Sequence, residues 1–413
     1  MKMRAAAAFG IVLAVAAPAL AQDRPGQIFH MTPGDMPAPY ATESVSNGSD
    51  TVPRGGREPD VPEGFEIRLF AQQVGGPRKM LVDSAGLVIV ARSSAGVISV
   101  LPDEDGNGRA DEIVDVVKGL NRPHGMALHG GYLWIADVNR LYRVPWRPGG
   151  GPADTVEAMS RDGVFGSTGG HWTRNIAFSP NGKQLYAAIG SRGNIGEEDL
   201  PRASVQRFEV DDDGTIDKSH TFAAGLRNPV GIAVRPEDGR VFVVVNERDG
   251  MGDGLVPDYF TEVLPDAFYG WPYAYIGPNP QPGFGNRRPD LVAKTVVPDV
   301  LFQSHSAPIG LTFLTQADVP EEWRDDALVT LRGSWNAAEP TGYKVVRVEF
   351  EDGRPTGRYV NFATGFRIDV PDPARPGSAK VWGRPVGVAV GPDGAIYVGD
   401  EVGGTVWRIT KKP

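Results

Sequence analysis

The chain has 413 residues, which is enough for one large closed β architecture or for two domains. Its formal net charge is −9 at pH 7, and an acidic protein of this kind is poorly suited to bind nucleic acid or anionic lipid. The sequence contains no cysteine, which excludes disulfides, thiolate metal sites, cysteine nucleophiles and a covalently attached c-type haem. Any redox chemistry must therefore use another cofactor or a partner.

The first residues carry the pattern of a secretory signal peptide. Two basic residues precede an apolar run over residues 5–20, and the run ends in the small-x-small sequence ALA at 19–21. We therefore expect residues 1–21 to be a signal peptide and the protein to be periplasmic or secreted. The alternative, a membrane anchor, is disfavoured because the run is short and rich in alanine.

The remainder divides into a short lead-in and one long repetitive domain. Residues 22–60 are rich in Pro, Gly, Ser and Asp, show little periodicity, and are expected to be loosely ordered. Over residues 61–413 one phrase recurs, in which an apolar strand, a glycine-containing turn and two further strands follow one another. Its six copies begin at Pro77, Arg122, His171, Arg227, Ala307 and Arg384.

This repetition predicts the architecture. Asn-Gly or Asp-Gly pairs at 181–182, 238–239 and 393–394 indicate hairpin turns between strands. Helical periodicity is scarce, and only PEEWRDDA at 320–327 has a helical pattern. We therefore predict an all-β fold, a six-bladed β-propeller of four-stranded antiparallel blades. Long loops are expected at 147–170 and 249–300, on a face where such insertions build the site.

Basic and polar residues precede the strand that begins each copy. In a propeller these positions converge around the mouth of the central channel, so a ring of positive charge on an acidic protein predicts an anionic ligand. Any single Arg-Pro or Asn-Pro pair could equally serve only to hold the backbone extended. The positions are occupied by Arg122-Pro123-His124, His171-Trp172-Thr173-Arg174-Asn175, Arg227-Asn228-Pro229, His305-Ser306-Ala307-Pro308 and Arg384-Pro385.

His171 is the strongest candidate for acid–base chemistry. It follows two glycines that leave room around it, and it precedes a first strand. Histidine is the usual general base near neutral pH. By contrast, His124 could be an interior histidine, and His30, His129 and His220 have the sequence context of surface residues.

Two acidic loops could bind calcium. Residues 246–259 combine four carboxylates with three glycines, and hard oxygen ligands of this kind suit Ca²⁺. Residues 103–112 resemble the first half of a calcium loop, but Val114 stands where a bidentate glutamate is needed. Either loop could equally be a solvated acidic turn.

Seven phrases in order resemble the soluble PQQ-dependent sugar dehydrogenases, in particular the L-sorbosone, pyranose and glucose dehydrogenase-like members of that family. The likeness runs from about residue 60 to 410, over nearly the whole predicted domain. The phrases are GGHWTRNIAFSPNGKQLYAAIGS, GLRNPVGIAV, NERDGMGDGLVPDYFTEV, YGWPY, SHSAPIGLTFL, LRGSWNAAEPTGYKVVRV and GRPVGVAV.

The resemblance implies that the channel mouth holds pyrroloquinoline quinone (PQQ), a flat tricarboxylate, and a calcium ion. The ion would bridge the quinone and the main-chain carbonyls of Arg248 and Asp249. His171 would remove the sugar hydroxyl proton as hydride passes to PQQ, and Arg227 would stabilise the developing negative charge. The cofactor-binding residues would be Asn228, Arg384, and Lys344 or Arg332, to which the ring positions add His124 and Arg174.

Three functions follow from these features. The first is an exported quinoprotein dehydrogenase that oxidises a sugar or a related alcohol or aldehyde and passes electrons to a separate cytochrome or quinone. The second is a calcium-dependent lactonase, which would need inward Glu, Asp and Asn side chains where this chain supplies Arg and His. The third is a non-catalytic propeller that binds protein or glycan.

Overall fold

The computed structural model of the chain describes residues 23–152, 155–211, 213–368 and 377–413. The predicted signal peptide therefore lies outside the described residues. Within them, secondary structure is almost entirely strand, and the one α-helix is α1 (Pro289–Val292). The predicted helical segment at 320–327 contains only a single 3-10 turn, η4 (Glu321–Trp323). In the described part of the chain no helix is long and apolar enough to cross a membrane.

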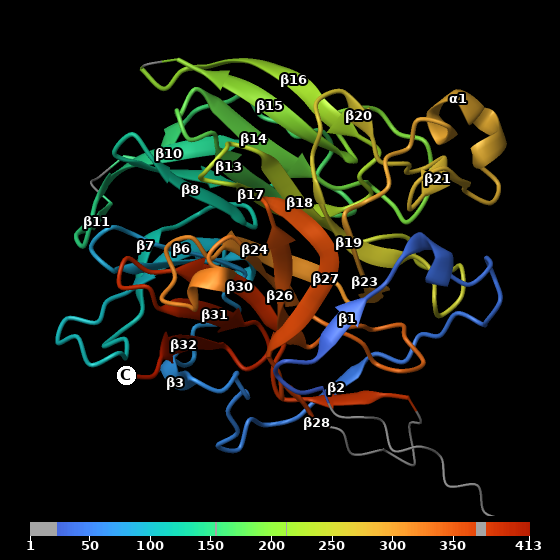
Figure 1. The fold of residues 1–413 in the computed structure, drawn as a ribbon. Coiled ribbons are helices and arrows are strands. Elements are labelled where there is room, and N and C mark those ends of the chain that lie inside the picture. The colour runs from blue at the N-terminus through green and yellow to red at the C-terminus, as the bar shows by residue number, and fades with distance from the viewer. Residues whose placement is uncertain (1–22, 153–154, 212, 369–376) are drawn as a thin grey trace, which may run out of the picture.

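Six sheets of four or five strands form the body of the molecule (Figure 1). The first contains β4 (Lys79–Val82), β5 (Val88–Arg92), β6 (Val97–Leu101) and β7 (Val114–Val117), and the second β8 (Gly125–His129), β9 (Tyr132–Ala136), β10 (Leu141–Arg147), β11 (Gly151–Pro152) and β12 (Glu157–Ala158). The third contains β13 (Arg174–Phe178), β14 (Gln184–Ile189), β15 (Ser204–Val210), β16 (Ile216–Ala224) and β20 (Ala267–Phe268).

The second half of the chain continues the pattern. The fourth sheet contains β17 (Pro229–Val234), β18 (Val241–Val245), β19 (Pro257–Glu262) and β23 (Val300–Ser304). The fifth contains β24 (Pro308–Phe313), β25 (Ala327–Leu331), β26 (Lys344–Glu351), β27 (Arg354–Ala363) and β1 (Ile28–His30), and the sixth β30 (Pro385–Val390), β31 (Ile396–Asp400), β32 (Thr405–Lys411) and β3 (Phe65–Ala71). Smaller pairings join β21 (Ala274–Tyr275) to β22 (Asn279–Pro280), and β29 (Ala379–Val381) to β2 (Ser49–Thr51) and β28 (Arg367–Ile368).

These sheets confirm the all-β class and the strand order predicted within each copy. The Asn181-Gly182, Asp238-Gly239 and Asp393-Gly394 pairs join the first two strands of their sheets, as expected. The predicted loop at 249–300 is wrong in part, because residues 257–262 of it form β19 inside the fourth sheet. The sequence there, PDYFTE, is fully buried in its first five residues and so shows no alternation that would mark a strand.

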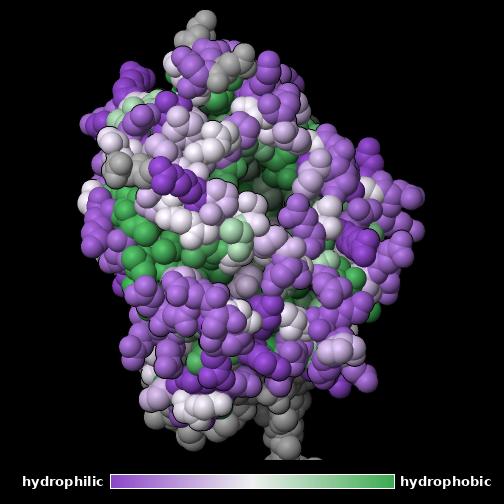
Figure 2. Space-filling model, turned by 90° about the vertical axis from the view of Figure 1, so that its left-hand side faces the viewer, coloured by the Kyte–Doolittle hydropathy of each residue, from purple (hydrophilic) through white to green (hydrophobic). Residues whose placement is uncertain are grey.

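Each pair of neighbouring sheets shares a hydrophobic cluster. In one example, Phe242 and Phe260 of the fourth sheet stack with ring centroids 5.3 Å apart, and Phe313 and Phe350 of the fifth sheet pack edge-on against Phe242. The first strands β4, β8, β13, β17, β24 and β30 contact one another in succession, and β30 returns to β4. One face of the molecule is mostly hydrophilic, with some apolar areas, and carries a hollow (Figure 2).

The lead-in is docked on this body and is not loose as expected. Its strand β1 adds to the edge of β27, and β2 pairs in parallel with β29 (Figure 1). Both strands are three residues long, which is too short for a periodic pattern to appear in the sequence. The last sheet is completed by β3, which pairs along its length with β32 near the other end of the chain.

Glycines set how closely the first strands approach one another. Four of these strands contain Pro-x-Gly, at Gly125, Gly231, Gly310 and Gly387. A Cβ atom at Gly310 would lie 2.4 Å from the carbonyl oxygen of Val386 in the next first strand, and one at Gly125 would lie 2.3 Å from that of Arg174. The phrase PVGIAV therefore combines an extended entry with a residue that lets two backbones meet.

We predict that Gly310→Ala lowers the free energy of unfolding by about 1–3 kcal/mol, because the added methyl group meets backbone atoms that cannot move aside without shifting the neighbouring strand. Urea denaturation of the two proteins measures the change. Gly34→Ala is the matched control, since a Cβ there has its nearest neighbour at 3.6 Å. An equal, small effect of both substitutions would contradict this account of the ring.

Candidate functional site

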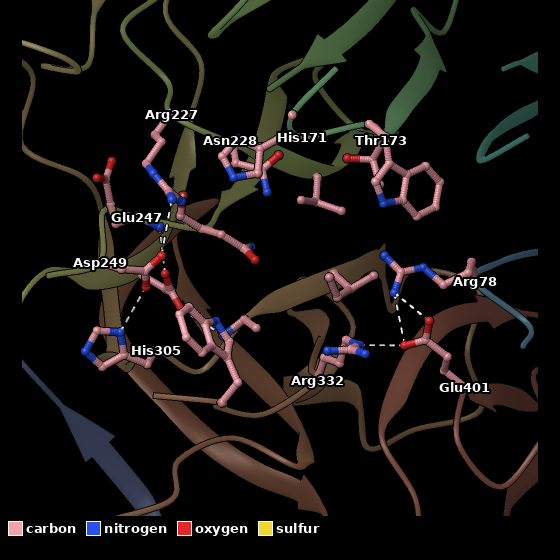
Figure 3. A pocket seen from close by; sticks show the side chains of 18 of the residues that line it. Arg78, His171, Thr173, Arg227, Asn228, Glu247, Asp249, His305, Arg332 and Glu401 are labelled. Atoms are coloured by element: carbon pink, nitrogen blue, oxygen red, sulfur yellow. Dashed lines mark hydrogen bonds and ion pairs between the residues drawn. The ribbon is translucent and has the colours of Figure 1, made fainter. Parts of the chain in front are cut away.

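A cavity of about 410 Å³ lies where the first strands begin and the second strands end (Figure 3). Its volume falls in the range of small-molecule sites. Four arginines, two histidines, four carboxylates and two exposed-edge tryptophans contribute to a mainly polar wall. The lining residues are Arg78, Ser94, Arg122, Gly170, His171, Trp172, Thr173, Arg227, Asn228, Val230, Asn246, Glu247, Asp249, Asp258, His305, Ala307, Ile309, Arg332, Trp335 and Glu401.

The structure brings together half of the candidate residues. His171, Arg227, Asn228, Asp249 and Arg332 all line the cavity, although they come from the loops of three different sheets. Each lies next to a strand end, so antiparallel hairpins deliver them to one edge of the body. Of the positions predicted to converge, Arg122, His171, Arg227, Asn228 and His305 line the cavity, whereas His124, Arg174 and Arg384 do not.

The other candidates do not line the cavity. Arg174 is buried beneath it and donates to the carbonyl oxygens of His171 and Ser167, at 2.8 and 3.1 Å. Lys344 Nζ pairs with Asp23 Oδ1 at 2.8 Å. These two cations are thus taken up by partners within the chain.

Arg384, His124 and Arg248 also stay outside the lining. Arg384 Nε donates to the carbonyl oxygen of Arg332 at 3.0 Å, so it supports the loop that carries Arg332. His124 is buried, and this burial together with the nearby charges of Arg78 and Lys79 lowers its pKa well below the usual value. A neutral, enclosed imidazole fits the alternative of an interior histidine.

Arg227 is held almost completely by the protein. Its Nε and Nη2 donate to Asn194, at 3.1 Å to the carbonyl oxygen and 2.9 Å to Oδ1, and Nη1 donates to the carbonyl oxygen of Asn246 at 3.1 Å. Nη2 also pairs with Asp249 Oδ2 at 3.3 Å. The guanidinium is therefore a fixed positive charge in the cavity wall, and only 4% of the residue is exposed.

His171 has one tautomer dictated by its neighbour. Its Nδ1 lies 2.9 Å from Ser191 Oγ and 3.0 Å from the Ser191 carbonyl oxygen. Because that hydroxyl donates its own proton to the carbonyl oxygen of Gly193 at 2.7 Å, Nδ1 must carry the hydrogen and donate it. Nε2 is then the basic nitrogen. Burial and the charge of Arg227 lower the histidine pKa to about 3, which keeps the ring neutral at physiological pH.

Asp249 links both sides of this region. Its Oδ1 accepts from Asn336 Nδ2 at 2.8 Å and lies 3.4 Å from His305 Nδ1. Burial favours a raised pKa for Asp249, but the hydrogen bond from His305 and the charge of Arg227 outweigh it and lower the pKa. The same pairing raises the pKa of His305 despite its burial. Asp249 thus lies between the guanidinium group of Arg227 and the imidazole of His305 (Figure 3).

A second charged group lies across the cavity. Arg78 Nη1 donates to both carboxylate oxygens of Glu401, each at 3.1 Å, and Arg332 Nε donates to Glu401 Oε2 at 2.5 Å (Figure 3). The two guanidinium charges outweigh the effect of burial and lower the Glu401 pKa. Arg122 lies 4.1 Å from the centroid of the Trp172 ring, and Arg78 lies 5.2 Å from it.

Sequence reasoning missed Arg78 and Glu401. Arg78 follows the proline that opens the first copy, and comparison of that position with Arg122 and Arg384 would have found it. Glu401 stands after the second strand of the sixth sheet, where an acidic turn residue carries no special signal. Its importance comes only from its contacts with two arginines.

The backbone around the cavity is also unusual. Arg122, His305 and Ala307 have φ angles of 53°, 66° and 54°, in the left-handed region that residues with a side chain rarely adopt. Such conformations cost free energy and cluster where a side chain must be aimed at a ligand. All three residues line the cavity.

Two further carboxylates lie deep in the wall below Asp249. Burial raises the pKa of Glu247 to about 7 and that of Asp258 to about 6. Asp258 accepts from the backbone N–H groups of Glu247 and Ala307, at 2.7 and 2.8 Å. Within the described ranges, no group of three His, Asp or Glu side chains is placed to enclose a metal ion.

The acidic loop at 103–112 forms a compact turn. Asp103 accepts from the backbone N–H groups of Asn107 and Gly108, at 3.0 and 2.9 Å, and Asp111 accepts from that of Glu104 at 2.8 Å. These contacts order the turn, and each carboxylate oxygen keeps a further lone pair.

The fold and the cavity define an all-β protein with a basic, ligand-sized central site. A model of the TrAA12-like family matches residues 59–256 and 290–412, so the chain belongs to this family. A PQQ-dependent pyranose dehydrogenase of Coprinopsis cinerea is 25% identical over 418 aligned positions, which cover 85% of this chain. The chain spans about half, 54%, of the length of that relative.

Two solved structures share the fold. A family AA12 enzyme of Trichoderma reesei superposes with a TM-score of 0.70 at 20% identity, over 88% of this chain and 100% of its own. The holo PQQ domain of the C. cinerea pyranose dehydrogenase superposes with a TM-score of 0.68, also at 20% identity, over 88% of this chain and 98% of its own. This chain is therefore similar in sequence and in fold to PQQ-dependent sugar dehydrogenases.

The raised pKa of Glu247 predicts a pH-dependent stability. A group whose pKa rises from 4.5 to about 7 on folding stabilises the protein fully below pH 4.5, and this contribution is lost as the pH rises through 7. Between pH 4 and 8, the titration of Glu247 should lower the unfolding free energy of the wild type by about 3 kcal/mol. Glu247→Gln should lack this part of the decrease. Chemical denaturation across this range measures it, with Glu63→Gln at an exposed carboxylate as control. Parallel wild-type and Glu247→Gln profiles would contradict the burial argument.

Proposed function

We propose that the protein is an exported quinoprotein dehydrogenase that oxidises a sugar, or a related alcohol or aldehyde, with PQQ and Ca²⁺. The observation that carries this proposal is the cavity itself. Four arginines and two histidines line a space of about 410 Å³ in an acidic protein, and of the four carboxylates beside them Glu247 and Asp258 have raised pKa values. Such a wall suits a flat anionic cofactor, and the named relatives are PQQ-dependent.

We further propose that the six large sheets are the blades of a six-bladed propeller. The support is the succession of contacts among the first strands, which returns from β30 to β4. The axis of this ring carries a small apolar cluster of Val230, Ile309 and Val386 beneath the cavity. Residues 61–413 would then form one propeller domain, with the lead-in docked on its outside.

Two groups of side chains, on opposite sides of the cavity, are suited to bind a tricarboxylate. Arg78, Arg122 and Arg332 offer guanidinium donors on one side, where Glu401 uses only part of their hydrogen-bonding capacity. Asn228 lies on the opposite side, and its buried Oδ1 has no hydrogen-bond partner among the described residues. We assign these residues to cofactor binding, and we leave Lys344, Arg384, His124 and Arg174 out of direct contact.

The proposed calcium ion would bind beside Asp249. The main-chain carbonyl oxygens of Arg248 and Asp249 each accept one hydrogen bond, from Val256 at 3.3 Å and from Asn194 at 2.8 Å, and each keeps a second lone pair. The carboxylates of Asp249 and Glu247 are hard ligands on the same wall. A divalent cation there would also offset the cost of burying these acids.

In this proposal the chain supplies the proton transfer and the electrostatics. When bound, PQQ provides a quinone that accepts the hydride from the carbon being oxidised. His171 Nε2 takes the proton of the substrate hydroxyl, because the Ser191 contacts keep the hydrogen on Nδ1. Arg227 is fixed by its contacts with Asn194 and Asn246, and it stabilises negative charge without reorganising. Electrons would then pass to a separate cytochrome or quinone.

A titration of the protein without residues 1–21 tests the cofactor. We expect PQQ to bind with a change in quinone absorbance, more tightly when Ca²⁺ is present, and we expect aldoses or related polyols to reduce it. A lactone hydrolysis assay with Ca²⁺ alone, run in parallel, reports on the lactonase alternative. Absence of PQQ binding would overturn the proposal.

Replacement of the proposed base separates binding from chemistry. We expect His171→Gln to lower kcat by about 10²–10⁴-fold while PQQ affinity changes little, since the histidine acts on the proton and not on the carboxylates. Steady-state kinetics and the PQQ titration give the two values. His220→Gln, at an exposed position on β16, is the matched control. Wild-type turnover by His171→Gln would show that another group is the base.

A further inference from the structure

Trp335 presents an exposed indole to the cavity. The residue is 49% exposed, and it lies among the residues that line the cavity wall. The other large exposed hydrophobic residues of the described ranges, Ile28, Tyr40, Val156, Leu200, Leu264 and Val297, lie elsewhere. A tryptophan left open at a polar cavity offers a large flat contact area to a ligand.

The main chain of Trp335 is fixed from one side by the lead-in. The carbonyl oxygen of Trp335 accepts from the backbone N–H groups of Asn47 and Gly48, at 3.1 and 2.7 Å. Asn47 Nδ2 also donates to the carbonyl oxygen of Ala337 at 2.6 Å. The segment of residues 40–48 thus holds the loop from outside the cavity.

On its other side, the loop that carries Trp335 is bonded to the acidic loop that carries Asp249. Asn336 Nδ2 donates to Asp249 Oδ1 at 2.8 Å, and the backbone N–H of Ala338 donates to Asp253 Oδ1 at 2.6 Å. The lead-in also binds this second loop, because Thr42 Oγ1 and Ser44 Oγ accept from the backbone of residues 252–253 at 2.8 and 3.0 Å. The indole is therefore exposed but attached to a rigid support.

The hydrogen-bonding side chains and the apolar indole of the cavity wall suit different parts of one substrate. His171, Arg227 and Asn228 offer groups that bond hydroxyls, whereas Trp335 offers an apolar face. A pyranose ring has the same division, with hydroxyls around its rim and C–H groups on its faces. An acyclic polyol has no rigid C–H face of this kind.

We propose that Trp335 stacks on the ring of a pyranose substrate and that Asn47 is the residue that positions it. This inference rests on the proposed function, and it selects ring sugars over acyclic alcohols and aldehydes. Trp335 thereby acts on substrate binding and not on the cofactor. Asn47 acts through the loop, because its side chain donates to the carbonyl oxygen of Ala337 and its backbone N–H to that of Trp335.

The first test compares Trp335→Ala and Trp335→Phe with the wild-type holoenzyme. We expect Trp335→Ala to raise KM for D-glucose, D-galactose or D-mannose about tenfold, and Trp335→Phe to raise it less, with kcat and the PQQ titration unchanged. KM for erythritol should not change. Leu264→Ala, at another exposed apolar residue, is the control. An unchanged KM for every pyranose in Trp335→Ala would overturn the proposal.

The second test concerns Asn47. Asn47→Ala keeps the backbone N–H contacts and loses the side-chain hydrogen bonds to the carbonyl oxygens of Ala337 and Gly377. We therefore expect a smaller, few-fold rise in KM for pyranoses and none for erythritol. A general loss of structure would instead lower kcat and PQQ affinity together. That joint loss, or no change in KM, would contradict a positioning role.

A binding measurement separates this inference from the proposed function. Tryptophan fluorescence is followed as D-glucose is added to the wild type and to Trp335→Phe, with and without PQQ. We expect a sugar-dependent change that Trp335→Phe lacks. If D-glucose reduces PQQ but the fluorescence of the wild type and of Trp335→Phe responds equally to the sugar, only the role of Trp335 is overturned. A sugar-dependent change at Trp335 without PQQ binding would overturn the quinoprotein function alone.

Discussion

The close approach of the first strands around one axis is the constraint on which the rest of the structure depends. At Gly125, Gly231 and Gly310 there is no space for a side chain between neighbouring backbones. Strands packed this tightly must begin at nearly the same level, and their hairpins then bring second-strand ends to the same edge. Residues from four or more repeats can therefore meet in one cavity although they are hundreds of positions apart in the chain.

Charge inside that cavity is tolerated because it is paired or neutralised locally. Arg227 bonds main-chain and amide oxygens as well as Asp249, and Glu401 bonds two arginines. His171 and Glu247 respond in the opposite way, through pKa values shifted toward their neutral forms. Burying an ion is costly unless partners surround it, so these contacts fix the guanidinium groups before any ligand arrives.

The sequence predicted the parts of the molecule that repeat. Strand pairs joined by Asn-Gly or Asp-Gly predicted the class of fold, and the residues before the first strands predicted that His171, Arg227 and Asn228 lie at one site. Asp249 and Arg332 were predicted from the resemblance to a known family. The predictions from the sequence were wrong where the position of a side chain depends on contacts between distant segments of the chain. Lys344 and Arg384 are cations in the right repeats, but Asp23 and the carbonyl oxygen of Arg332 hold them away from the cavity. The docked lead-in was missed because its strands are three residues long.

The pairing of β3 with β32 joins the two ends of the repetitive domain in one sheet. Neither strand can find its final partner until the last residues of the domain have left the ribosome. The cluster of Trp407, Ile409 and Phe65 stays exposed until then, and so does the outer side of the first sheet. The contacts that join the first and sixth sheets are therefore the last ones for which both partners become available during synthesis.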